Sequence, residues 1–103
     1  MKKLLILFDY GTSNIWDVTN PSEPKISLEV EGLPVSEIVK NKLIEIRTAY
    51  ENLFLNNKSE FSFKGFSSIE EKKKFTKLTE QVIKDFKNEL PEWIVEIDVE
   101  SMP

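Results

Sequence analysis

The chain contains one uninterrupted run of five apolar residues, close to its N-terminus. This run, Leu4 to Phe8, is followed by the polar stretch D-Y-G-T-S-N (residues 9–14), and Ile15-Trp16 then resumes the apolar character. Gly11 tolerates a positive φ angle, and Ser and Asn are common in turns. The stretch therefore predicts a β-hairpin, with the rest of the chain packed around it.

Size and composition limit what else the chain can hold. The 103 residues are 40% hydrophobic and 31% charged, as expected for a single globular domain spanning residues 1–103. A chain of this size buries roughly two-thirds of its unfolded surface, enough for one sheet with a helix layer but not for two lobes around a cleft. It contains no His and no Cys, which excludes disulfides and the usual zinc sites, and we expect no metal and no cofactor.

The N-terminal residues MKKLLILF begin like a secretion signal. The apolar run is nevertheless too short for a signal core or for a membrane span. We therefore expect a cytoplasmic protein with no membrane partner.

Charge is unevenly distributed along the chain. The formal net charge is −4, and the segment from residue 92 to residue 103 has four acids and no base: Glu92, Glu96, Asp98 and Glu100. Proteins that bind nucleic acid concentrate Lys and Arg, so this balance argues against a nucleic-acid partner. An acidic patch is better suited to a basic protein partner.

Periodicity predicts a third strand and a first helix. Residues 25–31 (KISLEVE) alternate apolar and polar side chains, as in a half-buried strand. Ser36 is a suitable N-cap for a helix running to about Leu55. Its apolar face repeats at steps of three and four residues through Val39, Leu43, Ile46, Tyr50 and Leu53.

The segment from Phe61 to Phe66 has three aromatic residues in a short, glycine-broken connection. We interpret it as a loop anchored by buried phenylalanines, since burial is the usual fate of such side chains. If the rings were exposed, they would form a binding patch. A second helix follows, capped by Ser67 or Ser68 and closed by Pro91.

The final apolar segment, residues 93–100, reads as a strand with one core face and one acidic face. Trp93, Val95, Ile97 and Val99 alternate with Ile94 and three acids. A right-handed crossover through the second helix would place it parallel to the first strand. The predicted fold is α+β: a small mixed sheet with the N-terminal hairpin central and the C-terminal strand added, and two α-helices packed on one face.

The letters LILFDYGTSN resemble the first phosphate motif of the actin-like ATPases. The resemblance implies an Asp9 that works with a metal-bound water and turn amides that hold phosphate. It covers about ten residues, and such enzymes need a second lobe that a chain of this size cannot form. We therefore interpret Asp9, Gly11, Thr12 and Asn14 as a capped turn. A carboxylate pair of Asp9 and Asp17 across the hairpin is an open alternative.

A second resemblance extends over the whole chain. The sequence is similar to small bacterial proteins with an apolar strand, D-Y-G, [LI]-W-D, L-P and a helix patterned L-x-x-W-x-x-x-Y. The matching positions are Asp9-Tyr10-Gly11, Ile15-Trp16-Asp17, Leu33-Pro34 and Leu43-x-x-Ile46-x-x-x-Tyr50, with Ile46 in place of the family's tryptophan. The resemblance implies an immunity protein, of the type that neutralises secreted bacterial toxins such as those of contact-dependent growth inhibition.

Our first hypothesis is thus a non-enzymatic immunity-type protein that binds a cognate, basic and nuclease-like toxin domain. Asp17, Glu96, Asp98 and Glu100 would steer the partner, and Trp16 would either anchor it or lie in the core. The second hypothesis is an assembly subunit that forms a homodimer. The third is a phosphate-binding enzyme centred on Asp9.

Overall fold

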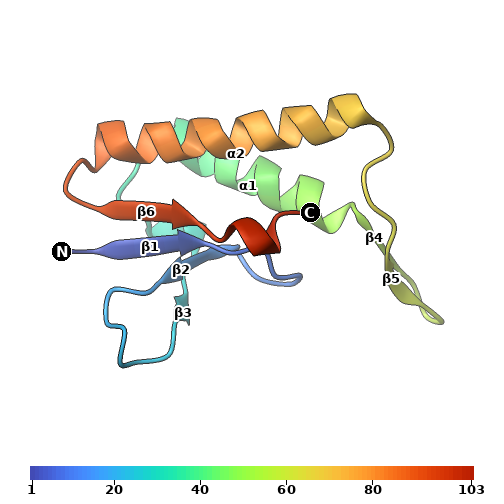
Figure 1. Ribbon diagram of the computed structural model, residues 1–103, viewed down its shortest axis with the longest axis horizontal. Helices are drawn as coiled ribbons and strands as arrows, with labels where there is room; N and C mark the ends of the chain where they lie inside the picture. The colour runs from blue at the N-terminus through green and yellow to red at the C-terminus, as the bar shows by residue number, and fades with distance from the viewer.

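The apolar run forms β1 (Lys3–Ile6), which lies in the middle of a four-stranded sheet in the computed structural model of residues 1–103 (Figure 1). β1 pairs antiparallel with β2 (Ile15–Asp17), and β2 pairs with the short edge strand β3 (Ile26–Ser27). On its other side β1 pairs in parallel with β6 (Ile94–Ile97). The predicted hairpin, the central position of β1 and the parallel C-terminal strand are therefore confirmed.

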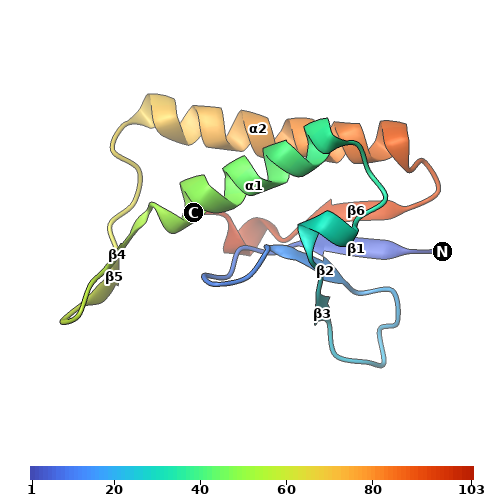
Figure 2. The same cartoon turned by 180° about the vertical axis from the view of Figure 1, so that it is seen from behind.

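Two helices cover one face of this sheet (Figures 1 and 2). α1 (Glu37–Glu51) begins at Ser36, whose hydroxyl accepts the Val39 N–H at 3.4 Å. α2 (Ile69–Glu89) begins at Ser68, whose hydroxyl accepts the Glu71 N–H at 3.2 Å. Both caps satisfy amides that have no partner inside the helix. The α+β architecture predicted from the sequence is confirmed, and neither helix is both long and apolar enough to cross a membrane.

Polar contacts tie the two helices together at the end where α1 begins and α2 ends. The Glu89 carboxylate accepts the backbone N–H of Ser36 at 2.6 Å and its hydroxyl at 2.7 Å. One and a half turns further along α1, the Lys42 ammonium lies 2.7 Å from the Asp85 carboxylate. These contacts hold α1 and α2 antiparallel above the sheet.

The core lies between the helices and β1, β2 and β6. Its buried apolar residues are Leu4, Ile6, Phe8, Ile15, Val30, Leu33, Val39, Leu43, Ile46, Tyr50, Leu53, Phe75, Val82, Phe86 and Val95. Side chains alternate along a strand, so Leu4, Ile6 and Phe8 face the helices while Leu5 and Leu7 face away. Leu5 and Leu7 are only half-buried. One apolar run thus supplies both the core and part of an uncovered sheet face.

Two predicted elements are shorter than the sequence pattern indicated. The third strand covers only Ile26–Ser27, and a 3₁₀ helix, η1 (Val30–Gly32), replaces the rest of it. This turn brings Val30 into the core, which a straight edge strand would not do. α1 ends at Glu51 rather than near Leu55, because the chain turns at Asn52 and enters β4 (Phe54–Asn56).

The aromatic segment differs most from its prediction. Phe61–Phe63 is a strand, β5, which pairs antiparallel with β4 to form a hairpin that projects from one end of the molecule (Figure 1). Phe61 and Phe63 are each 55% exposed, so the prediction of a loop with buried phenylalanines is wrong for these two residues, whereas Phe66 is half-buried and packs against the core. The two rings contact only part of the chain, chiefly the rings of Tyr10 and Phe54, and the rest of their surface faces solvent.

The C-terminal strand also ends earlier than predicted. β6 stops at Ile97, and Asp98 caps a 3₁₀ helix, η2 (Val99–Ser101), by accepting the Glu100 N–H at 3.1 Å. Val99 is therefore 77% exposed rather than buried. The capping side chain stops the alternation of the strand, since its hydrogen bond requires a turn.

Candidate functional site

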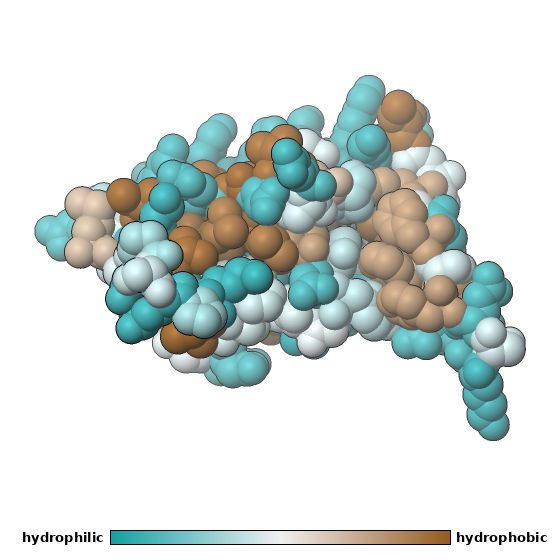
Figure 3. Space-filling view, turned by 60° about the horizontal axis from the view of Figure 1, so that its bottom comes forward, coloured by the Kyte–Doolittle hydropathy of each residue, from teal (hydrophilic) through white to brown (hydrophobic).

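The uncovered face of the sheet, which we call the open face, carries Leu5, Leu7, Trp16, Ile94 and Glu96. Leu5 lies opposite Trp16 on one side and opposite Glu96 on the other. Figure 3 shows apolar side chains gathered on this side of the molecule, in the middle of the face and again towards one end. An uncovered apolar face rimmed by charge is typical of a protein-binding surface.

Trp16 lies on the open face and outside the core. Its indole N–H donates to the Leu7 carbonyl at 3.1 Å, which fixes the ring along the sheet. The Lys25 ammonium lies 5.1 Å from the ring centroid, within the range of a cation–π interaction. Of the two roles considered for Trp16, its position is compatible with that of an anchor.

Asp17, the next residue of β2, lies opposite Leu4, so its side chain points to the other face of the sheet from Trp16, where groups of its own chain bind it. The Lys2 ammonium is 3.0 Å from its carboxylate, and the Thr19 N–H donates to it at 2.9 Å. Hydrogen bonding by Thr19, together with Lys2, lowers the pKa of Asp17 from its ordinary value of 3.8 to about 2. Its charge is therefore largely compensated within the chain.

The three C-terminal acids do not share one face. Glu96 is exposed on the open face, with the Lys3 ammonium 3.8 Å away. Beyond the strand, Asp98 caps η2 and Glu100 lies within it. A hydrogen bond from the Phe8 N–H to the Ser101 hydroxyl, at 3.0 Å, joins η2 to the segment that follows β1. The structure thus brings Trp16 and Glu96 together and separates them from Asp98 and Glu100.

The carboxyl end of the sheet gathers acids that have no ion-pair partner. Asp9 follows Phe8 directly, and Phe8 is hydrogen-bonded to η2, so Asp9 lies at the end of the sheet where η2 is found. Asp9, Asp98 and Glu100 take part in none of the five ion pairs of the molecule. Burial, with the negative charge of Asp9 as a second cause, raises the pKa of Tyr50.

The turn of residues 9–14 pairs several of its polar groups internally, although the buried side-chain Nδ2 of Asn14 has no hydrogen-bond partner. The Asp9 N–H donates to the Asn14 side-chain oxygen at 2.9 Å, and the Asn14 N–H donates to the Thr12 hydroxyl at 3.1 Å. Asn14 adopts a φ of 67° and is buried. Three amides of the turn, those of Asp9, Thr12 and Asn14, are thus paired within it, which favours the capped turn over the phosphate loop.

The alternative of a facing Asp9–Asp17 carboxylate pair is wrong. Asp17 lies opposite Leu4, five residues before Asp9. At about 3.3 Å per residue along a strand this separates the two acids by about 16 Å. No group of three or more acidic residues in the molecule is arranged so that it could hold a metal ion.

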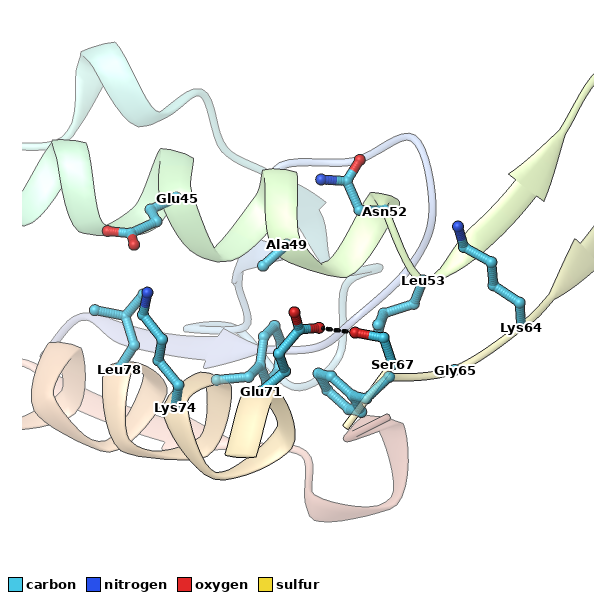
Figure 4. A pocket seen from close by; sticks show the side chains of 12 residues that line it. Glu45, Ala49, Asn52, Leu53, Lys64, Gly65, Ser67, Glu71, Lys74 and Leu78 are labelled. Atoms are coloured by element: carbon cyan, nitrogen blue, oxygen red, sulfur yellow. Dashed lines mark hydrogen bonds between the residues drawn. The ribbon is translucent and has the colours of Figure 1, made fainter. Parts of the chain in front are cut away.

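A groove with a volume of about 440 Å³ lies between α1 and the first turns of α2 (Figure 4). Glu45 of α1 and Lys74 of α2 point towards each other across it, above Ala49 and Leu78. The Glu71 carboxylate accepts the Ser67 hydroxyl at 2.6 Å, so this acid serves the start of α2. The groove contains none of the residues predicted from the sequence to contact a partner.

The exposed aromatic residues of β4 and β5 were not predicted as a site. Phe54, Phe61 and Phe63 lie on one face of this hairpin, because Phe54 is opposite Phe63 and Asn56 is opposite Phe61. The signal in the sequence was the alternation Phe61-Ser62-Phe63, which places both rings on the same side of a strand.

The model of the family described as "Serratia CdiI immunity protein-like" matches residues 2–98. No curated protein matches the chain. The matched residues include the whole four-stranded sheet, both helices and the hairpin of β4 and β5. This finding confirms the resemblance to immunity proteins, while the part played in it by the D-Y-G and I-W-D motifs remains a prediction. The chain therefore belongs to the Serratia CdiI immunity protein-like family.

Proposed function

We propose that this protein neutralises a cognate bacterial toxin domain by binding to it in a one-to-one complex. The observation that carries the proposal is the family match over residues 2–98, which spans nearly the whole fold. Protection would come from covering the toxin's active site or its access to substrate, without chemistry by the immunity protein. The proposal places the protein in the cytoplasm of the cell that it protects.

The partner that fits best is a basic domain. A toxin that cleaves nucleic acid needs Lys and Arg to bind phosphates, and such a surface would complement the acids of this chain. Asp98 and Glu100 have no ion-pair partner, and the pair of Glu96 with Lys3 at 3.8 Å is exposed and therefore weak. Asp17 contributes less than these three, because Lys2 and Thr19 already compensate its charge.

Trp16 would provide apolar contact on the same surface. Its ring lies beside Leu5 and Leu7 on the open face, and the hydrogen bond of its indole fixes its orientation before binding. Fixed aromatic rings lose little conformational entropy on association, which is one reason why Trp is enriched among the residues that dominate interfaces.

The direct test mixes the purified chain with the toxin domain encoded beside it. We expect a stoichiometric complex in size-exclusion chromatography, inhibition of the toxin at one equivalent, and growth of cells that co-express both proteins. Absence of a complex with an active toxin domain would refute the proposed function.

The role of charge is tested by the association rate. Glu96→Lys with Glu100→Lys should slow association by about tenfold or more and weaken its dependence on salt, because charged pairs act chiefly on encounter. Glu80→Lys with Glu70→Lys makes the same change in net charge on α2 and is the matched control. Equal on-rates for the two double variants would remove the acids of the C-terminal segment from the contact surface.

A homodimer through the open face is the second candidate, favoured by the half-buried Leu5, Leu7 and Trp16. Sedimentation of the purified chain at increasing concentration distinguishes the two. The homodimer would be favoured if the wild-type chain dimerises without affinity for the toxin domain and the Trp16→Ser variant is monomeric.

A further inference from the structure

The hairpin of β4 and β5, residues 54–63, gathers exposed apolar side chains at one end of the molecule and is called here the aromatic hairpin. Phe61 and Phe63 are each 55% exposed, and Leu55 on the other face of the hairpin is 39% exposed. Figure 3 shows apolar side chains at this end of the molecule, apart from those in the middle of the sheet. Neither the predicted contact residues nor the proposed function uses it.

Ring contacts fix the aromatic hairpin to the body of the protein. The Phe54 ring lies 5.2 Å from that of Tyr50, and Tyr50 lies 5.1 Å from Phe8 in the core. From the other side Tyr10 contacts Phe54 at 5.0 Å and Phe61 at 4.8 Å. Aromatic pairs at these separations are favourable, so a continuous series of rings runs from the core to the exposed end.

Backbone hydrogen bonds close the base and the tip of the hairpin. The N–H groups of Lys64 and Gly65 both donate to the Leu53 carbonyl, at 2.7 and 3.1 Å, and the Asn57 N–H donates to the Glu60 carbonyl at 2.9 Å. An isolated two-stranded hairpin is marginally stable in water at best. The rings and these bonds therefore hold Phe61 and Phe63 in place before any partner binds.

We propose that the aromatic hairpin is the main anchor for the toxin domain, with the rings of Phe61 and Phe63 filling an apolar pocket of that partner. This inference rests on the proposed function and adds the surface that supplies most of its binding energy. Aromatic side chains, Phe included, are enriched in protein interfaces, and rings that are already held in place lose little conformational entropy on association.

Charge favours a protein partner over a lipid surface. The hairpin and its exit carry Lys58, Glu60 and Lys64, and the neighbouring Tyr10 is preceded by the unpaired Asp9. The start of α2, which lies beside this exit, adds two acids and three lysines in residues 70–74. Acids interspersed among these lysines oppose binding to an anionic lipid surface, which attracts concentrated basic clusters. A protein surface around an apolar pocket can match both signs of charge as well as the rings.

Area argues against a second copy of this chain as the occupant. β4 and β5 have three residues each. Symmetric pairing of two such hairpins would bury much less than the roughly 800 Å² per partner of a standard stable interface. A toxin domain can contact the aromatic hairpin and the neighbouring acids together and so reach that area.

The test compares the affinities of three variants for the toxin domain encoded beside this chain, by calorimetry. Phe61→Gln/Phe63→Gln should weaken binding by about a hundredfold or more. Phe61→Leu/Phe63→Leu keeps part of the apolar contact area and should weaken binding by only about tenfold. Ile38→Gln removes an even more exposed apolar side chain, 67% exposed, from α1 and should leave the affinity within about twofold. Hydrogen exchange at the Lys64 and Gly65 amides shows whether the hairpin is still formed.

The outcomes separate the two proposals. If the wild-type chain binds and the Gln double variant, with its Lys64 and Gly65 amides still protected, binds within threefold of it, the anchor assignment is wrong while the proposed function stands. If the wild-type chain does not bind, the proposed function itself fails. Two other results would also overturn the inference. In one, the wild-type chain binds phosphatidylserine vesicles; in the other, it forms a concentration-dependent dimer. In either case the Gln double variant would lose that property and keep its affinity for the toxin domain.

Discussion

The body of the protein and the aromatic hairpin use the same residue type in opposite ways. In the body, formed by the four-stranded sheet with α1 and α2, Phe8 is 6% exposed, Phe75 is 4% exposed and Phe86 is fully buried. In the hairpin, Phe61 and Phe63 are each 55% exposed. The difference arises because the body has a second layer over its apolar face, whereas the hairpin has rings on one side and no layer above them.

This contrast separates stability from recognition. Burial of about 25 cal/mol per Å² of apolar area makes the body the source of most folding free energy. The exposed rings contribute little to that free energy, and their apolar area is still available for an interface. A substitution in the body should therefore change the free energy of unfolding with little direct effect on contact with a partner. A substitution in the aromatic hairpin should change contact with a partner with little effect on the free energy of unfolding.

The largest expected effect comes from Phe86→Ala in the body. Phe86 is fully buried between α2 and the sheet, so truncation removes its packing and leaves a cavity, at about 3–5 kcal/mol. Urea unfolding should show this loss, against less than about 1 kcal/mol for Phe63→Ala in the hairpin. Similar losses for the two variants would contradict the division between body and hairpin.

Phe54→Ala tests the joint between the two regions. Phe54 contacts Tyr50 on the body side and Phe61 and Phe63 on the hairpin side. Because it is only partly buried, we expect a loss of about 2 kcal/mol, roughly half the value for a core phenylalanine. Hydrogen exchange should accelerate at the Asn57 and Lys64 amides while the amides of β1 stay protected. Uniform acceleration over both regions would show that hairpin and body open as one unit.

Two glycines with positive φ angles give a smaller, matched comparison. Gly11 (φ 85°) lies in the turn between β1 and β2, and Gly65 (φ 78°) lies at the exit of the aromatic hairpin. An alanine in this region costs about 1 kcal/mol. Gly11→Ala should lower global stability by that amount, while Gly65→Ala should be relieved by local opening of the hairpin. Gly32→Ala is the control in thermal unfolding, because a Cβ atom at Gly32 meets no atom within 4 Å and the residue has no positive φ angle.

The smallest effect is the pH dependence of Asp17→Asn. Folding lowers the pKa of Asp17 from 3.8 to about 2, so the ionised carboxylate favours the folded state. The stabilisation is complete above the unfolded pKa and is lost as the pH falls through the folded one. At this surface position it should be below about 1 kcal/mol. The stability gap between wild type and variant should therefore close between about pH 4 and pH 2, and a gap independent of pH would contradict this origin.

Local patterns predicted most of the body correctly. The apolar run with its turn predicted β1 and β2, Ser36 predicted the start of α1, and the alternation around Val95 predicted β6 in parallel with β1. These predictions succeed because each depends on contacts between near neighbours or on one strongly apolar face. The family resemblance rested on the same segments, and the match over residues 2–98 confirms its coarse form.

The failures lie where distant parts of the chain decide the outcome. The prediction of buried phenylalanines at 61–66 assumed that an apolar residue would find a core, but the layer that could have covered Phe61 and Phe63 ends with α1 at Glu51. Val99 was assigned to the core because the strand was extended past Asp98, whose side chain instead caps η2. The partner-contact role of Trp16, Asp17, Glu96, Asp98 and Glu100 remains a prediction.

The sequence by itself determined the class of fold, the central strand Leu4 to Phe8 with its turn, and the kinship with immunity proteins, because these depend on local propensity, periodicity and motif spacing. Only the tertiary structure decided which apolar side chains are covered. Burial depends on how far each layer extends over its neighbour, and this property arises from the packing of α1, α2 and the sheet together. The open face and the aromatic hairpin, the two surfaces assigned here to a partner, are both consequences of where that covering stops.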